Sequence, residues 1–237
     1  MKVYAIGDLH LDSVVEKPMD IFGPGWDNHW ERIVDNWKSR VTEDDMVLIP
    51  GDISWAMRTQ EAIPDLELIK ALPGKKIIIR GNHDYWWESI SEVRSLLDEN
   101  MWALQNDSIR INNVIVCGTR GWAVPEKEFK TKDDEKIYNR ELIRMELALQ
   151  DLAKKRQEGD TAIAMIHYPP FNAKLLPSEF TRLFEQYKID KVVYGHLHGR
   201  GCRACKYLEQ NGIQYYLTSC DQVNCELVEI LGENDGI

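Results

Sequence analysis

Histidine, aspartate and asparagine residues follow five short apolar segments of this 237-residue chain. Each segment is rich in β-branched residues, as strands are, and the polar residues come where it stops. Imidazole, carboxylate and amide groups bind metals or transfer protons when they share a site. The polar residues are Asp8, His10, Asp52, Asn82, His83, His167, His196 and His198, which include five of the six histidines.

The elements that carry these residues alternate between strand and helix patterns. Strands are predicted at residues 2–6, 46–49, 77–79, 163–166 and 192–194, and helices at 29–40, 60–72, 88–99, 132–157 and 178–187. Such alternation is typical of right-handed crossovers in a largely parallel sheet. Ligands of open α/β sheets bind at the carboxyl ends of the strands. We therefore expect the polar residues to converge.

Antiparallel pairing is expected in two other places. Asn112-Asn113 tolerates the positive φ of a hairpin turn and predicts a hairpin within residues 108–118. Residues 213–219 and 226–231 are predicted to form a closing antiparallel pair, and residues 13–30 and 119–131 to be loops. Because no linker divides the chain, we expect residues 1–237 to form one domain.

Composition restricts the partners. The chain has 29 Lys and Arg against 39 Asp and Glu, a formal charge of -10, which disfavours extended nucleic acid as a partner. No apolar run approaches the roughly 18 residues of a membrane span, no signal peptide precedes the first strand, and the cysteines number five. We expect a cytoplasmic protein with reduced thiols; the oligomeric state stays open.

The candidate ligands are too many for one tetrahedral metal site. Asp8 and His10, spaced i, i+2, would point to one side of an extended backbone and chelate one ion. Two ions roughly 3.5–4 Å apart that share a carboxylate fit the set better. Imidazole with carboxylate and amide, without thiolate, suits Mn, Fe, Co, Ni or Zn rather than Ca, with Mn, Fe or Zn favoured.

Formal charges indicate the substrate class. Two divalent ions bring four positive charges, two aspartates remove two, and a bridging hydroxide leaves about one. A centre of that charge suits an anionic phosphoryl group.

The blocks resemble, in order, the signature of the calcineurin-like metallophosphoesterase superfamily. They are Gly7-Asp8-Leu9-His10, Gly51-Asp52, Gly81-Asn82-His83-Asp84, His167 and Gly195-His196-Leu197-His198. The resemblance implies a four-layer αββα sandwich of two mixed sheets flanked by helices. It also implies one metal on Asp8, His10 and His198, another on Asn82, His167 and His196, and a bridging Asp52. Tyr168 stands where several relatives have a second histidine.

The resemblance further implies a hydrolytic mechanism. A hydroxide bridging the metals would attack phosphorus in line, with His83 facing the leaving group. Asp84 would orient His83 or cap the following helix. We expect a phosphoesterase acting on a small phosphodiester or nucleotide-type substrate; the alternatives are a phosphomonoesterase and a metal-binding scaffold for protein partners.

Weaker signals lie around these motifs. Aromatic residues could stack on a nucleobase, Trp86 among them, or pack in the core; they are Trp55, Tyr85, Trp86, Trp87 and Trp122. Arg58 and Arg120 are candidates to bind a phosphate group bidentately. His29 is either a surface or helix-capping residue or a ligand.

The cysteines raise one more alternative. Cys202-x-x-Cys205 with Cys220 and Cys225 could form a structural zinc site, although the spacing of the second pair is loose.

Overall fold

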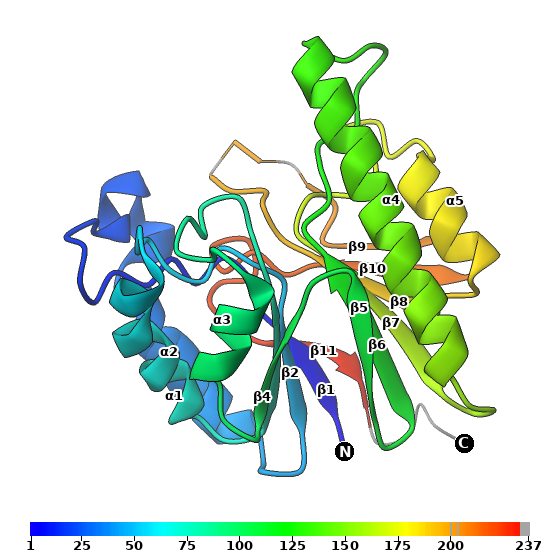
Figure 1. Cartoon of the computed structure of the whole chain (residues 1–237). Helices are drawn as coiled ribbons and strands as arrows, with labels where there is room; N and C mark the ends of the chain where they lie inside the picture. Colours follow the sequence, from blue (N-terminus) through cyan, green and yellow to red (C-terminus); the bar gives the residue numbers. More distant parts are fainter. Residues whose placement is uncertain (200, 203, 233–237) are drawn as a thin grey trace.

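The computed structural model describes residues 1–199, 201–202 and 204–232. A first, five-stranded sheet has the order β11-β1-β2-β3-β4, with β1 to β4 parallel and β11 antiparallel to β1 (Figure 1). Its strands are β1 (Val3–Ala5), β2 (Met46–Ile49), β3 (Lys75–Ile79), β4 (Met101–Leu104) and β11 (Val228–Leu231).

A second, six-stranded sheet has the order β5-β6-β7-β8-β10-β9. Its middle strands β6, β7, β8 and β10 are parallel, and the two edge strands are antiparallel to their neighbours. The strands are β5 (Asp107–Ile111), β6 (Val114–Thr119), β7 (Thr161–Ile166), β8 (Lys191–Tyr194), β9 (Tyr207–Gln210) and β10 (Ile213–Leu217).

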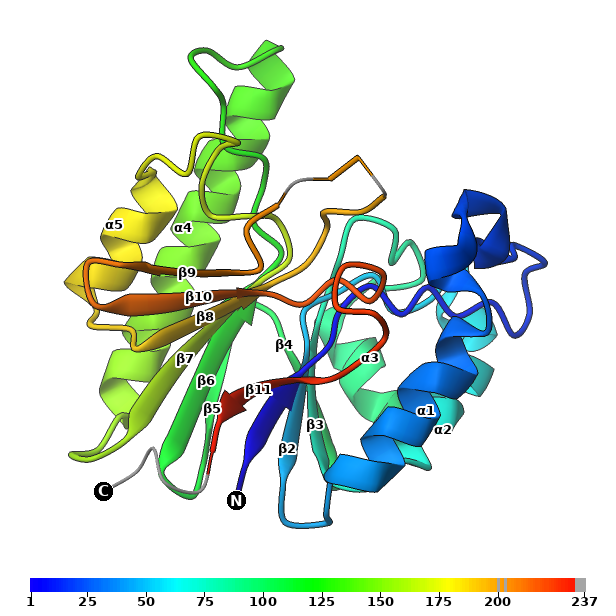
Figure 2. The same cartoon turned by 180° about the vertical axis from the view of Figure 1, so that it is seen from behind.

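Helices cover the outer face of each sheet (Figures 1 and 2). Three of them lie on the first sheet, α1 (His29–Arg40), α2 (Ile63–Lys70) and α3 (Ile90–Leu96), and two on the second, α4 (Lys132–Lys155) and α5 (Glu179–Gln186). Short 3-10 helices occur at Met19–Phe22, Pro24–Trp26 and Thr59–Ala62. Among the described residues, none of the helices combines the length and the apolarity that crossing a membrane requires.

Alternating side chains of the strands build three apolar layers. In β1, Val3 and Ala5 face the other sheet, whereas Tyr4 packs with the helices. The same holds in the second sheet, where Val116 faces inward and Cys117 packs under α4 and α5. Strands buried on both faces are apolar throughout, which made their sequence pattern clear. The fold is thus the expected four-layer αββα sandwich.

Local sequence explains where several helices begin. Thr131 accepts a hydrogen bond from the Asp134 amide at the start of α4, and Ser178 forms a capping box with Thr181 at α5. The predicted helix 60–72 instead starts as a 3-10 turn and becomes α-helical at Ile63.

The predicted closing antiparallel pair is wrong. Strand β10 lies parallel to β8 in the second sheet, whereas β11 pairs with β1 in the first. Between them, the Gly7 amide donates to the Thr218 carbonyl at 2.8 Å, and the chain passes across the end of β1. Two strand-like segments close in sequence had suggested a hairpin, but each finds its partner in a different layer.

The 108–118 hairpin is confirmed, with Asn112 at φ 54°.

Candidate metal centre

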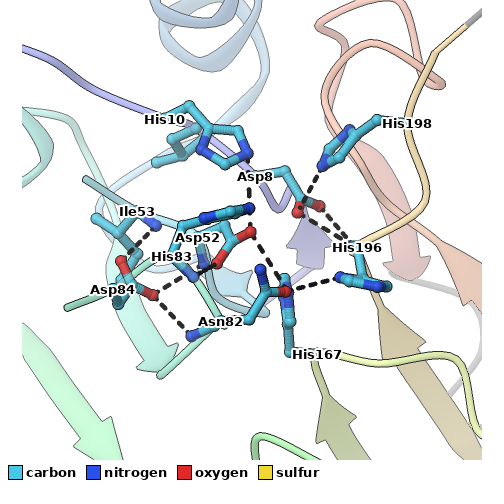
Figure 3. Close-up of polar contacts among 12 residues, drawn as sticks. Asp8, His10, Asp52, Ile53, Asn82, His83, Asp84, His167, His196 and His198 are labelled. Carbon is cyan, nitrogen blue, oxygen red and sulfur yellow. Dashed lines mark hydrogen bonds and ion pairs between the residues drawn. The ribbon is translucent and has the colours of Figure 1, made fainter. Parts of the chain in front are cut away.

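The strand ends of both sheets meet at one edge of the molecule. The first sheet brings Asp8, Asp52 and Asn82 from beyond β1, β2 and β3, and the second brings three histidines (Figure 3). These histidines are His167, directly after β7, and His196 and His198, after β8. All six side chains point toward one another, as the sequence predicted.

The backbone reaches this arrangement through left-handed turns rather than extended chain. Asp8 has φ 59° and His10 has φ 46°, so the predicted extended i, i+2 chelate is wrong in its backbone geometry. Asp52 and His196 also have positive φ, at 52° and 72°. Non-glycine residues rarely adopt this region, and functional sites are where such strain collects.

One group of possible ligands surrounds Asp8. Ligand atoms of Asp8, His10, Asp52 and His198 all lie within 4.8 Å of one another. His198 Nε2 is 3.0 Å from Asp8 Oδ1, and His10 Nε2 is 3.7 Å from Asp52 Oδ2. Two donors bound to one ion at about 2.1 Å lie roughly 3.3 Å apart. The spacing therefore suits a cation among them.

A second group surrounds Asn82. Its Oδ1 lies 2.7 Å from His167 Nε2 and 2.7 Å from His196 Nδ1. Asp52 Oδ2 is 3.5 Å from His167 Nε2, nearly the same distance that separates it from His10. Asp52 is therefore common to both groups.

Hydrogen bonds fix the tautomers of two of these histidines. The Nδ1 of His167 lies 2.9 Å from the Pro50 carbonyl oxygen, which can only accept, so the ring is protonated there. The Nδ1 of His198 lies 2.9 Å from the Asp221 carboxylate. In both residues Nε2 is then the nitrogen that faces the centre, the usual arrangement of histidine ligands and their outer partners.

The protonation equilibria also suit a cation. Burial, with Asp8 nearby, raises the pKa of Asp52 to about 7. Burial lowers the pKa of His196 to about 3 and that of His10 well below its usual value, which keeps both rings neutral and able to bind a metal. For His198, burial is outweighed by Asp8 and Asp221, and its pKa rises to about 10. A cation here would offset the repulsion between the buried carboxylates.

Two motif glycines let the carboxylates sit where they do. A Cβ on Gly81 would overlap Asp52 Oδ1, and a Cβ on Gly195 would overlap Asp8 Oδ2. Both places need the close approach that only glycine allows.

A family model described as calcineurin-like phosphoesterase matches residues 1–200. The chain belongs to this family. The matched range includes both groups of residues around Asp52. Against curated proteins, a search of the sequence finds no match.

Solved structures share the phosphoesterase fold at low sequence identity. A protein from Thermus thermophilus has a TM-score of 0.62 at 12% identity, covering 97% of both chains. A phosphopantetheinyl hydrolase from Mycobacterium tuberculosis has 0.58 at 14%, covering 98% of this chain and 96% of its own. A protein of unknown function from Aquifex aeolicus has 0.53 at 15%, covering 96% and 95%.

His83 lies at the rim of the phosphoesterase centre. Its amide donates to Asp52 Oδ1 at 2.7 Å, and its ring lies 4.6 Å from that of Trp55. Its Nδ1 is buried and, within the part of the chain that the structure describes, has no hydrogen-bond partner. Burial, then Lys17, lowers the pKa of His83. The ring is thus positioned without being engaged.

Asp84 does not take either position expected for it. It is fully buried, and its two oxygens accept hydrogen bonds from four backbone amides and the Trp86 indole. Ser89, not Asp84, caps α3. The carboxylate instead ties together the loops after β2 and β3, since the amides belong to Asp52, Ile53, Ser54 and Gly81.

The aromatic residues divide between core and rim. Trp86 and Trp87 are 0% and 1% exposed, so the predicted substrate contact of Trp86 conflicts with its burial in the first sheet's core. Trp55 stacks on His10, with ring centroids 4.6 Å apart, and Lys17 covers its ring. Tyr85 is 49% exposed. The position of Trp86 after a strand-end motif correctly predicted that it lies near the site. It could not show that the side chain points into the core.

Arg120 lies next to the metal-site loops but interacts elsewhere. Its Nη2 is 3.4 Å from Glu141 Oε1, and its guanidinium lies 5.0 Å from the Trp122 ring. Arg58 is exposed at the start of the 3-10 turn before α2. The phosphate contact predicted for these arginines stays a prediction.

The remaining predicted alternatives concern His29 and the cysteines. His29 begins α1 and its Nε2 lies 2.9 Å from the Leu9 carbonyl, which ties the helix to the loop after β1. Cys220 and Cys225 are buried, with sulfur atoms 3.2 Å apart. Among residues 1–199, 201–202 and 204–232, the group able to hold a metal contains no cysteine.

Sequence reasoning missed Asp221. It orients His198 and also accepts from the Gly199 amide at 2.8 Å. Asp221 follows β10, which is parallel to β8, so the strand-end rule would have found it. Assigning β10 to an antiparallel pair hid that signal.

A largely apolar cavity opens beside the centre. Its volume is about 260 Å³, and it is bounded by histidines of the site and by side chains of the 13–26 segment. The lining residues are His10, Met19, Phe22, Trp26, Trp55, His83, His198 and Gly199.

Proposed function

We propose that this family member hydrolyses a small phosphodiester or nucleotide-type ester with two divalent metal ions, Mn, Fe or Zn. The observation that carries the proposal is the position of Asp52. Its Oδ2 lies 3.7 Å from His10 Nε2 and 3.5 Å from His167 Nε2, between two sets of nitrogen and oxygen donors. A carboxylate so placed suits a bridge between two ions.

The donor sets support the following assignment of ligands. Asp8, His10 and His198 would hold one ion, and Asn82, His167 and His196 the other. When bound, the ions would supply a hydroxide nucleophile at neutral pH and offset charge on the phosphoryl oxygens. Asp8 and Asp52 are the two charged ligands, so the centre keeps the positive charge that an anionic substrate needs.

His83 is the residue we assign to the leaving group. Its unbonded Nδ1, its ring 5.7 Å from that of His10, and its position in the wall of the apolar cavity support this role. It would donate an N–H to the departing oxygen, a contribution typically worth 10²–10⁴-fold for a poor leaving group.

The apolar cavity supports a substrate whose phosphorus carries a second organic group besides the leaving group. It adjoins His10, His83 and His198, and aromatic and aliphatic side chains form most of its wall. A phosphodiester has two organic groups and can place one there, whereas a monoester has a single group. The acidic charge of -10 disfavours an extended nucleic acid.

The test is turnover by protein stripped of metal and reloaded separately with Mn, Fe or Zn. Bis-p-nitrophenyl phosphate represents diesters and p-nitrophenyl phosphate represents monoesters. We expect metal-dependent hydrolysis that favours the diester and that Asp52→Asn lowers by more than about 100-fold, since even outer partners of metal ligands are worth 10–100-fold.

Asp44→Asn is the matched control, because Asp44 is exposed. It should leave turnover unchanged. Preference for the monoester would favour the phosphomonoesterase alternative. Stoichiometric metal binding without turnover of either ester would favour the scaffold.

A further inference from the structure

A second cavity, which is polar, lies at the same edge of the sheets and does not include the metal ligands. Its volume is about 310 Å³, and its wall includes four arginines, Arg80, Arg120, Arg140 and Arg144. Arg80 follows β3, Arg120 follows β6, and the other two belong to α4. The cavity therefore forms where both sheets meet the long helix.

The charges in this cavity do not balance. Four guanidinium groups face two carboxylates, Glu88 and Glu141, which leaves a formal excess of two positive charges. Glu141 is fully buried and lies 2.7 Å from Arg144, 3.4 Å from Arg120 and 3.7 Å from Arg140. One carboxylate thus pairs with three arginines and, over the described residues, forms no ion pair with Arg80.

Two donors in the cavity are unused. The Nε atoms of Arg80 and Arg120 are buried and, over the described residues, have no hydrogen-bond partner. A buried donor left without an acceptor is costly, and native structures usually supply one. The guanidinium groups of Arg80 and Arg120 line the same cavity and carry like charges, so they repel each other. An anion between them would satisfy both donors and reduce the repulsion.

We propose that this cavity is an anion site for a phosphate or carboxylate group, distinct from the metal centre. Guanidinium groups bind such groups with paired, charge-assisted hydrogen bonds. The volume is about ten times the roughly 30 Å³ that one water occupies in the liquid. It can therefore hold the anionic end of a larger molecule as well as a free ion.

The cavity is linked to the metal-site loops. Arg80 immediately precedes Gly81-Asn82, and the Arg120 carbonyl accepts a hydrogen bond from the His167 amide at 3.0 Å. Arg120 also packs on Trp122, Trp122 on Tyr168, and Tyr168 on the ring of His196. The occupant is thus either a second acidic group of the substrate or a free anion that adjusts the ligand loops.

The experiment is calorimetric titration of inorganic phosphate into the full chain without metal, where the metal centre cannot bind the probe. Arg80→Gln is the main variant, because the Arg80 side chain makes no hydrogen bond with the described residues that the substitution could remove. We expect its phosphate affinity to fall about 10- to 100-fold, the worth of a charge-assisted hydrogen bond. Arg120→Gln should behave alike, and thermal unfolding verifies that each variant folds.

Arg182→Gln is the matched control, since Arg182 is exposed and pairs with Glu179 on α5. It should keep wild-type affinity. Glu141→Gln removes the competing carboxylate and should tighten binding. Undetectable phosphate binding by the wild type, or equal losses in Arg80→Gln and Arg182→Gln, would overturn the proposal. None of these outcomes depends on turnover, so they test the cavity separately from the proposed phosphoesterase activity.

A kinetic experiment distinguishes an anion that belongs to the substrate from a free anion in the cavity. The substrates are p-nitrophenyl phosphodiesters whose second arm carries either a carboxylate or its methyl ester. If the occupant belongs to the substrate, the wild type prefers the carboxylate by a lower KM, and Arg80→Gln removes the preference. If the occupant is a free anion, the two diesters have equal KM while the phosphate affinity remains. Both results support the site and assign its ligand.

Discussion

The two sheets contribute different chemistry to the candidate centre. The first sheet supplies the charged and amide groups, Asp8, Asp52 and Asn82, together with the imidazole of His10, whereas the second supplies only imidazoles. Their supports differ as well. Loops of the first sheet are joined by the five hydrogen bonds of Asp84, whereas each imidazole of the second is held by one outer contact or by ring packing.

We infer that the acidic half of the centre, the first-sheet loops that carry Asp8 and Asp52, needs firm backbone support because these two carboxylates repel each other. Asp8 and Asp52 are buried close together, and burial with this repulsion raises the pKa of Asp52. Holding like charges together requires a backbone fixed by strong contacts. Among the described residues, the imidazole half has no such pair of buried carboxylates and can rely on weaker contacts. Substitutions in the two halves should therefore change stability or metal affinity by different amounts, and some of them in opposite directions.

The largest effect is expected for Asp84→Asn. An amide keeps one acceptor oxygen, so at least the two amides that now face one carboxylate oxygen lose their partner. At about 1–3 kcal/mol for each unsatisfied donor, unfolding becomes easier by roughly 2–6 kcal/mol. For a chain of this size Tm should fall by roughly 5–20 °C. Calorimetry against Asp44→Asn checks it, and an unchanged Tm would remove the rigid support from the comparison.

Asp52→Asn should have the opposite sign in protein without metal. The pKa of Asp52 is raised to about 7 in the folded chain, so its contribution to stability is present at pH 4 and is lost as pH rises to about 7. Asparagine does not titrate. At pH 8 the variant should therefore be more stable than wild type by a few kcal/mol, since each pKa unit is worth about 1.36 kcal/mol.

Thermal unfolding in EDTA at pH 4.5 and pH 8 measures this difference. The gain should be small at the lower pH and full at the higher one. Saturating Mn²⁺ should restore the advantage of the wild type, because a ligand that binds the folded state stabilises it. If Asp52→Asn gains the same stability at both pH values, repulsion of the ionised Asp52 carboxylate is not the cause of the gain.

Asp221→Ala should produce a smaller change confined to one ion. It removes the partner of the His198 Nδ1, and the loss of such outer partners lowers metal affinity by about 10–100-fold. His167 keeps its Pro50 carbonyl, a backbone group that the substitution leaves alone. Metal titration should show one weakened equivalent and one unchanged, and two equally weakened equivalents would contradict independent support of the histidines.

The smallest effect is expected at Tyr168, whose ring lies 4.1 Å from that of His196. Its hydroxyl makes no hydrogen bond with the described residues, so Tyr168→Phe should change metal affinity by less than about threefold. Tyr168→Ala removes the ring contact and should cost more, about 0.5–1.5 kcal/mol beyond lost burial. If the two variants behave alike, ring packing does not hold the imidazole half.

Sequence predicted the fold wherever local pattern decides it. Helix α1 and strand β2 have the predicted bounds, and the hairpin turns at Asn112. Strand β4 was not predicted, because Met101–Leu104 is short and ends in no motif, and β9 is half exposed and polar. Partner choice for β10 and β11 depends on layers that local patterns do not describe.

At the centre, sequence predicted which side chains meet but not what holds them. The ligand types and strand ends were enough to bring six residues together. The acceptor role of Asp84 depends on amides from another loop, 30–32 residues away in the chain. The arginine cavity likewise requires α4 to lie against the ends of β3 and β6, which residue spacing alone cannot give.

The pairing of β11 with β1 has a consequence for synthesis on the ribosome. Strand β1 is synthesised well before one of its neighbours, Val228–Leu231. At about 5–20 residues per second, roughly 11–46 s separate the two. Until then the β1 edge offers unpaired backbone groups to other nascent chains. A factor that shields this edge during translation should therefore raise the yield of folded protein.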